Sequence, residues 1–254
     1  MAGVLFSARD GVGLLELDRP AVLNALNRPM YESLQARLAA AAGDGEVRVL
    51  IVAGRGRSFC AGTDLGELAG AGRESTRALG LLENRVCSRL EDFPRPTIAA
   101  IHGHALGAGC ELALACDLRL AADDAVLGQP EIDMGWLPAA GATFRLPALL
   151  GPARARQLIF TGRRVSAVEA LDMGLVDRVV PAARLVSEAG RLARDLSSKD
   201  AEVLLRAREV LKPPARAEAM RREAEDLAAL ATRPAAQRRI AEFLRGKAGP
   251  AQDP

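Results

Sequence analysis

Two short apolar segments, each followed by a glycine-rich turn, constrain the fold of this chain more than any other feature. Residues 47–53 (VRVLIVA) lead into a glycine-rich stretch at 54–66, and residues 96–101 (PTIAAI) lead into another at 103–109. Both segments are apolar at nearly every position, which is typical of parallel strands that helices cover on both faces. The sequence therefore predicts an α/β fold with a buried sheet.

Further strands and helices alternate along the chain. Strands are expected at 12–18, 117–121 and 176–180, and helices at 28–42, 75–90 and 110–116. Ser166-Ala-Val-Glu169 has the pattern of a capping box, so it predicts a short helix that stops at Gly174.

The character of the sequence changes after Pro181. From residue 182 onward only helical patterns occur, interrupted at Pro213-Pro214 and at Pro234. This tail has too few apolar residues for a core of its own. We therefore divide the chain into a core of residues 1–181, which carries the active site, and a C-terminal helical region of residues 182–254, which packs in an oligomer.

Composition excludes several classes of function. The chain has 254 residues and a net charge of +2, which is too small to indicate binding to nucleic acid or to an anionic membrane. No apolar run approaches the roughly 20 residues of a membrane-spanning helix, and the N-terminus lacks an export signal, so we expect a cytoplasmic protein. The cysteines at 60, 87, 110 and 116 show no CxxC pairing and are expected to be buried, reduced thiols.

The two glycine-rich turns are candidates for binding an oxyanion. A turn that leaves a strand and enters a helix exposes backbone N–H groups that have no helical partner. Two such turns can aim two N–H groups at one carbonyl oxygen, which is what enolate chemistry requires, because negative charge develops on that oxygen.

Glu111 and Glu131 are candidates for proton transfer because both lie among small and apolar residues. A carboxylate buried in such surroundings is either paired or functional, and burial raises its pKa toward the range useful for acid and base catalysis. The alternatives are an exposed helix face for Glu111 and a salt bridge in a loop for Glu131.

Other chemistries have less support. His102 and His104 are the two histidines, and no cysteine or acidic cluster accompanies them at the spacing of a metal site. The segment from Gly107 to Leu112 is a broken dinucleotide fingerprint, because Leu112 stands where the third glycine belongs. We therefore expect no metal ion and no nicotinamide cofactor.

Four ordered segments resemble motifs of the enoyl-CoA hydratase/isomerase family, also called the crotonase superfamily. They are residues 24–26 (NAL), 58–65 (SFCAGTDL), 104–113 (HALGAGCELA) and 128–132 (GQPEI), the last followed by Gly135, Leu137-Pro138 and Gly141. The resemblance runs from about Gly3 to Pro181, and the tail resembles the family's trimerisation region only in its helical character.

The resemblance implies a fold and a set of site residues. It implies a spiral of ββα turns followed by helices, assembled as a homotrimer or homohexamer. It places the backbone N–H groups of Thr63 and Ala108 around the oxygen of an acyl-CoA thioester. The residues that it assigns to binding substrate or coenzyme A are Ala25, Ala61, Thr63, Asp64, Leu65 and Ala108.

The resemblance also implies a reaction, the addition of water to a 2-enoyl-CoA. Glu111 would deprotonate the water that attacks C3, and Glu131 would deliver a proton to C2. No cofactor is required, because coenzyme A is part of the substrate.

Double-bond isomerisation is the main alternative, and RNA binding, which a few relatives perform, is another. Members of the family that only shift a double bond generally lack an equivalent of Glu111, so its presence favours hydration. Ala139 stands where hydratases commonly carry glycine near the bound water, and dienoyl-CoA isomerases carry an acidic residue at this position. For RNA binding the helix at 28–42 offers only Arg28 and Arg37 as basic residues.

Overall fold

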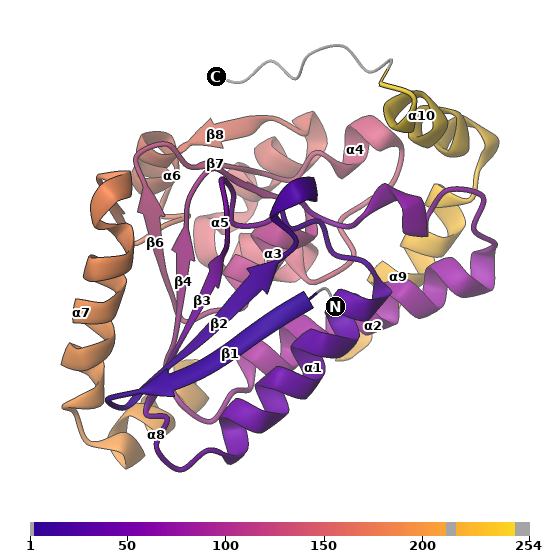
Figure 1. The fold of residues 1–254 in the computed structure, drawn as a ribbon. Coiled ribbons are helices and arrows are strands. Elements are labelled where there is room, and N and C mark those ends of the chain that lie inside the picture. The colour runs from indigo at the N-terminus through magenta and orange to yellow at the C-terminus, as the bar shows by residue number, and fades with distance from the viewer. Residues whose placement is uncertain (1–2, 212–216, 247–254) are drawn as a thin grey trace.

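The computed structural model of the chain describes residues 3–211 and 217–246. Six strands form one sheet: β1 (Gly3–Arg9), β2 (Val12–Asp18), β3 (Val49–Gly54), β4 (Thr97–Ile101), β6 (Leu118–Ala122) and β9 (Arg178–Val180), in the order β1-β2-β3-β4-β6-β9. β1 and β2 form an antiparallel hairpin, and every later neighbour in the order is parallel. The parallel strands run toward the end of the molecule where α4, β7 and β8 lie (Figure 1).

A second, three-stranded sheet contains β5 (His104–Leu106), β7 (Val126–Gly128) and β8 (Arg164–Ser166). The chain alternates between the two sheets. β4 enters the large sheet, β5 the small sheet, and α3 (Ala108–Leu114) follows; β6, β7 and α4 (Glu131–Met134) repeat this order. This is the expected spiral of ββα turns, so the predicted fold class is confirmed.

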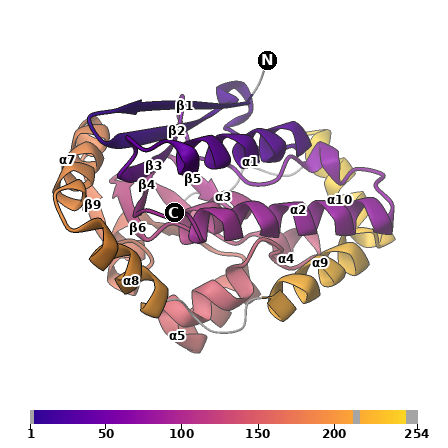
Figure 2. The same cartoon turned by 90° about the horizontal axis from the view of Figure 1, so that it is seen from below.

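The large sheet is covered by helices on both faces. Leu50 and Val52 of β3 point into a core shared with α1 (Arg28–Gly43), α2 (Arg73–Glu91), α3 and α5 (Ala142–Thr161). Val49 and Ile51 point the other way, into a core covered by α7 (Leu185–Ser197). Figure 2 shows α7 on one side of the sheet and α1 and α2 on the other. The apolar character of β3 at both alternating sets of positions follows from this double burial.

The other predicted helices and strands have bounds close to those expected from the sequence. The N-cap half of the predicted capping box is observed, because the Ser166 hydroxyl accepts the Glu169 N–H at 3.3 Å, whereas the Glu169 carboxylate pairs with Arg163 at 2.6 Å. The helix α6 (Ala167–Met173) ends, as predicted, at Gly174 in the left-handed conformation. The sequence analysis missed β1, although Asp10-Gly11 is a hairpin signal and both residues have positive φ. All four cysteines are buried and unpaired, as expected.

After β9 the described chain contains helices and no further strands: η3 (Ala182–Arg184), α7, α8 (Ala201–Leu211), α9 (Ala217–Ala231) and α10 (Pro234–Leu244). The predicted interruption at Pro234 is confirmed, since Pro234 is the first residue of α10. The interruption expected at Pro213-Pro214 lies outside the described residues. α9 packs along α2 (Figures 1 and 2).

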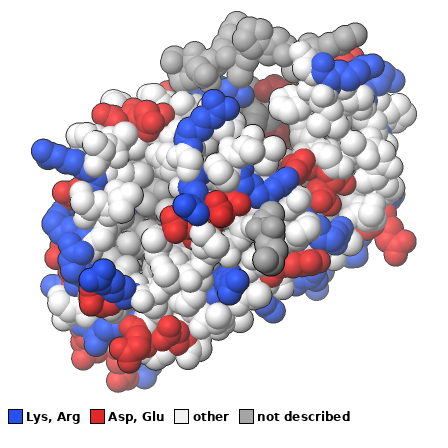
Figure 3. Space-filling model, in the orientation of Figure 1, with Lys and Arg blue, Asp and Glu red and all other residues white. Residues whose placement is uncertain are grey.

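On the face in Figure 3 basic and acidic side chains are interspersed. Across residues 3–211 and 217–246, no helix is both long enough and apolar enough to span a membrane.

Candidate active site

The two glycine-rich turns meet at the carboxyl ends of β3 and β4. The first turn pairs with β5, because the Cys60 N–H donates to the His104 carbonyl at 2.9 Å. The turns also touch at Gly62, which has φ +106°. A methyl group at Gly62 would lie 2.8 Å from the Leu106 oxygen and 3.7 Å from the Ala108 nitrogen. Only a residue without a side chain fits this contact, so glycine allows Thr63 and Ala108 to become neighbours.

Thr63 and Ala108 direct their N–H groups away from their own secondary structure. Leu26 bonds to the residues on either side of Thr63: its N–H donates to Gly62 at 2.8 Å and its carbonyl accepts from Asp64 at 2.9 Å. The Thr63 N–H therefore points to the opposite side from Leu26. Ala108 is the first residue of α3, where an N–H has no partner within the helix.

Glu111 is buried one helical turn after Ala108, with 1% of its surface exposed. Its Oε1 accepts the N–H groups of Ala140 and Ala142, each at 2.8 Å. Burial raises the pKa of Glu111, and the hydrogen bonds from Ala142 and Ala140 oppose that increase. The predicted alternative of an exposed helix face for Glu111 is therefore wrong.

Glu131 is the first residue of α4, is 9% exposed and lies against Gly107. Gly107 has φ +51°, and a methyl group there would lie 2.9 Å from Glu131 Oε1. The amide nitrogen of Gln129, in the orientation that satisfies its surroundings, donates to Oε1 at 3.1 Å and to Oε2 at 3.2 Å. Burial raises the pKa of Glu131 well above its usual range, and the nearby charge of Glu111 raises it further.

The first turn, α3 and α4 bring together two buried carboxyl groups and two outward-pointing N–H groups. Carboxyl groups with raised pKa values can both take up and release protons near neutral pH. The N–H groups can bind an oxygen on which negative charge develops. These are the requirements for proton transfer next to a carbonyl group.

Comparison with known proteins connects this arrangement to a family. A sequence profile described as enoyl-CoA hydratase/isomerase matches residues 7–244. The chain belongs to this family.

Relatives within the family are similar over most of the chain. A short-chain-enoyl-CoA hydratase of Clostridium acetobutylicum is 39% identical over 196 residues, which is 77% of this chain and 75% of that protein. A crotonyl-CoA hydratase of Syntrophomonas wolfei is 38% identical over 197 residues, 77% of this chain and 76% of its own length. The crystal structure of an enoyl-CoA hydratase/isomerase from Xanthobacter autotrophicus superposes with a TM-score of 0.87 and 32% identity, covering 96% of this chain and 93% of that one.

Three of the residues expected to bind substrate or coenzyme A, namely Ala25, Ala61 and Asp64, lie together at the edge of the first turn. Arg19 joins two of them, because its Nη1 donates to the Ala25 carbonyl at 2.6 Å and to Asp64 Oδ2 at 3.1 Å. Asp64 also caps η2 (Leu65–Glu67), since its Oδ1 accepts the Gly66 N–H at 3.1 Å. Ala61, which donates its N–H to the Leu23 carbonyl at 2.9 Å, completes this edge.

Glu83 on α2 is a third buried carboxyl group, and the sequence analysis missed it. It is 3% exposed, and its Oε1 accepts the hydroxyl groups of Thr63 at 2.7 Å and Tyr31 at 2.8 Å. Burial raises its pKa to about 7. A signal was available, because Glu83 shares the helix face of the buried residues Leu79 and Val86.

Arg145, Asn84 and Glu223 were also missed, although they surround the segment that binds Glu111. The Arg145 guanidinium donates to the Ala140 carbonyl at 2.8 Å and pairs with Glu91 Oε2 at 2.6 Å. Asn84 comes from α2 and Glu223 from α9. Their sequence separation from Glu111 hid this cluster.

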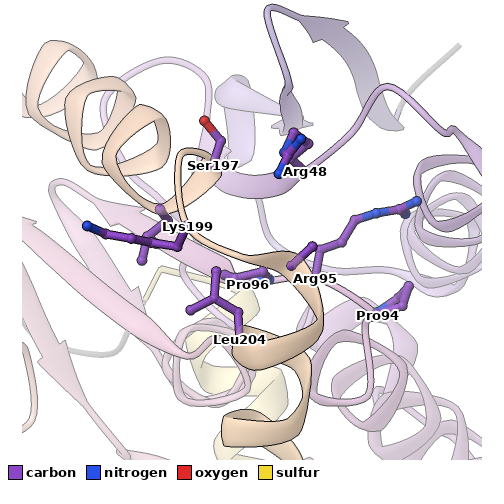
Figure 4. A pocket seen from close by; sticks show the side chains of 9 residues that line it. Arg48, Pro94, Arg95, Pro96, Ser197, Lys199 and Leu204 are labelled. Carbon is purple, nitrogen blue, oxygen red and sulfur yellow. The ribbon is translucent and has the colours of Figure 1, made fainter.

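Two other features lie outside this cluster. The pocket in Figure 4 is lined by Arg48, Arg95 and Lys199 among others, at the amino ends of β3 and β4 and so at the opposite end of the sheet. His102 Nε2 lies 2.9 Å from the Gly56 carbonyl and His104 Nδ1 lies 3.2 Å from the Ser58 hydroxyl, so both rings contact the first turn.

Proposed function

We propose that this chain adds water to a 2-enoyl-CoA thioester and forms a 3-hydroxyacyl-CoA. The observation that carries the proposal is the placement of Glu111 and Glu131. Both carboxyl groups are buried beside the turn that exposes the Ala108 N–H. The names of the relatives support the same reaction.

In the proposed complex the thioester oxygen accepts hydrogen bonds from the Thr63 and Ala108 N–H groups. These bonds strengthen as the C2–C3 double bond is attacked and negative charge moves to the oxygen. The coenzyme A part lies along Ala25, Ala61, Asp64 and Leu65. The enzyme needs no further cofactor for this step, because the thioester itself withdraws the electrons.

The two glutamates divide the addition of water between them. Glu111 takes a proton from a water molecule, whose oxygen bonds to C3. Glu131, protonated at the start, gives its proton to C2, so one water is added and each carboxyl group ends in the other's starting state. The raised pKa of Glu131 favours the protonated form that this role requires.

The other partner assignments stay predictions of the same proposal. We propose an acyl-CoA as the ligand, with no nucleic acid or membrane as partner, in a cytoplasmic homotrimer or homohexamer. Basic and acidic side chains both occur on the face shown in Figure 3, which supports the proposal that nucleic acid is not a partner.

Double-bond isomerisation is the second candidate, favoured by one observation. Ala139 is 4% exposed and adds a methyl group beside the segment that binds Glu111. That methyl group narrows the space for a water molecule, whereas isomerisation needs Glu131 and the two N–H groups but no water.

A panel of enoyl-CoA thioesters separates the candidates. With 2-enoyl-CoAs of increasing chain length, hydration removes the absorbance of the conjugated thioester. Loss of this absorbance with at least one chain length is the expected result. Formation of that absorbance from 3-enoyl-CoAs, with no hydration of any 2-enoyl-CoA, would replace hydration by isomerisation.

A further inference from the structure

The segment that donates to Glu111 is itself held by side chains from three helices. Asn84 Nδ2 on α2 donates to the Ala139 carbonyl, and Arg145 on α5 donates to the Ala140 carbonyl at 2.8 Å. Glu223 Oε1 on α9 accepts both the N–H, at 3.2 Å, and the hydroxyl of Thr143. These contacts lie on both sides of the Ala140 and Ala142 N–H groups, so they fix the donors of Glu111.

Two atoms of this arrangement lack a partner. Asn84 Oδ1 and Glu223 Oε2 are buried and make no hydrogen bond within the described parts of the chain. The Asn84 amide cannot be reversed, because its nitrogen is surrounded by the carbonyl groups of Ala139, Gly80 and Met220. Its oxygen therefore needs a donor, and an unsatisfied buried acceptor is costly.

Glu223 can supply that donor if it carries a proton. Glu223 is 3% exposed and lies beside Asn84, because the Asn84 amide nitrogen donates at 3.4 Å to the carbonyl of Met220, one helical turn before Glu223. Both side chains also bind residues 139–143. An ionised carboxylate offers only acceptors, so it would leave both atoms unsatisfied, whereas a carboxylic acid satisfies both with one O–H group.

We propose that Glu223 is a neutral carboxylic acid that donates to Asn84 Oδ1, and that this pair is a positioning device for Glu111. Glu223 and Asn84 do not contact the substrate in this proposal. They act by holding residues 139–143, whose N–H groups orient the base. The role at Glu111 rests on the proposed function, whereas the protonation of Glu223 does not.

The charges around Glu223 agree with a neutral state. Of the titratable groups that act on Glu223 or respond to it, Glu111 on α3 and Glu131 on α4 are acidic, and Cys87 on α2 is a buried thiol. The basic group of this cluster, Arg145 on α5, is paired with Glu91 at 2.6 Å. Burial, followed by the charge of Glu111, raises the pKa of Glu223 to about 8. Ionisation would place a second negative charge near that of Glu111, since Glu131 is protonated at the start of the proposed reaction.

Kinetics of four variants test the positioning role. We expect Glu223→Ala and Asn84→Ala to lower kcat of hydration by about 10²-fold, the cost of misplacing a catalytic group, with KM little changed. Glu223→Gln keeps an acceptor for Thr143 and a donor for Asn84, so it should restore most of kcat and remove the alkaline fall in rate caused by Glu223 ionisation. Glu225→Ala is the matched control, because Glu225 on the same helix is 46% exposed and pairs with Arg77.

The protonation state is measured without activity. The infrared difference between wild type and Glu223→Gln at pH 7 should contain the carbonyl band of a protonated carboxylic acid. A carboxylate band in its place would overturn the proposal. The proposal would also be overturned if the wild-type protein hydrates an enoyl-CoA and Glu223→Ala does so with the same kcat. A wild type that hydrates no enoyl-CoA but gives the acid band would refute the proposed function and leave the neutral Glu223 established.

Discussion

Four carboxyl groups of this site are buried, and burial changes their pKa values. Glu83, Glu111, Glu131 and Glu223 are all less than one-tenth exposed. A carboxyl group in such surroundings is stable only with hydrogen-bond donors or with a proton of its own. Each of the four has donors, and burial raises the pKa of all four. Burial therefore favours the protonated form of the carboxyl groups at this site.

A substitution at Thr63 distinguishes the contribution of its backbone N–H to turnover from that of its side-chain hydroxyl. Its hydroxyl donates to Glu83, whereas its N–H belongs to the proposed oxyanion hole. Thr63→Ala should keep turnover within roughly tenfold of wild type, because losing an oxyanion donor outright costs about 10²–10³ in rate. The comparison is steady-state hydration with coenzyme A binding and folding checked in parallel. A loss of 10²-fold or more would assign the main role to the hydroxyl.

Glu83 predicts a pH dependence of stability. Its pKa rises from 4.5 to about 7 on folding, so the folded state holds the proton more tightly than the unfolded state. The resulting stabilisation is complete below pH 4.5 and is lost as the pH rises to about 7. Glu83→Gln cannot titrate, so urea unfolding should show a smaller decrease in unfolding free energy across this window. Glu74→Gln, on the exposed side of the same helix, should retain the wild-type decrease.

The two glycine-rich turns and the helices α2, α3 and α4 position the groups of the site. The buried strands end at one edge of the sheet and could be predicted from their apolar character, as could the two turns. The sequence also predicted α1, α2 and the capped helix α6. It missed α5, because Pro147 and Pro152 lie inside that helix and Gly151 kinks it.

Gly107 is the turn residue on which the placement of Glu131 depends. In Gly107→Ala the methyl group would lie 2.9 Å from Glu131 Oε1 at a positive φ, so hydration should fall at least tenfold and stability by about 1–3 kcal/mol. Gly70→Ala is the matched control. Gly70 also has positive φ, at +68°, but nothing lies within 4 Å of the added methyl group. Equal loss of activity in both variants would show that strain, and not displacement of Glu131, is responsible.

The sequence motifs predicted the two glutamates and the two turns because each of them lies within one short, contiguous segment of the chain. Glu223 and Asn84 could not be predicted, because α9 reaches α2 only through the complete fold. The division into residues 1–181 and 182–254 stays a prediction. Of the helices after β9, α7 packs on the sheet and α9 on α2.

The exposed apolar residues of α8 predict that the protein assembles into an oligomer. α8 buries none of its residues, and Val210 and Leu211 are 82% and 80% exposed. Exposed apolar side chains of this kind mark contact surfaces. The family resemblance implies a trimer or hexamer, and we expect these side chains to lie in its interface. Sedimentation at micromolar concentration checks this, and Val210→Glu with Leu211→Glu should weaken the assembly. A wild-type protein that sediments as a stable monomer would contradict the prediction.

The proposed hydration mechanism is tested by separating the role of Glu111 from that of Glu131. Hydration of a short 2-enoyl-CoA, and exchange of the acidic C2 proton of a short 3-enoyl-CoA with deuterated solvent, are measured in Glu111→Gln and Glu131→Gln after folding and coenzyme A binding are confirmed. In Glu111→Gln hydration should fall by at least the 10²–10⁴ typical of general base catalysis, while C2 exchange survives. In Glu131→Gln both activities should disappear. Hydration at the wild-type rate in Glu111→Gln would contradict the proposal that Glu111 deprotonates the attacking water, because Glu111 would then be structural.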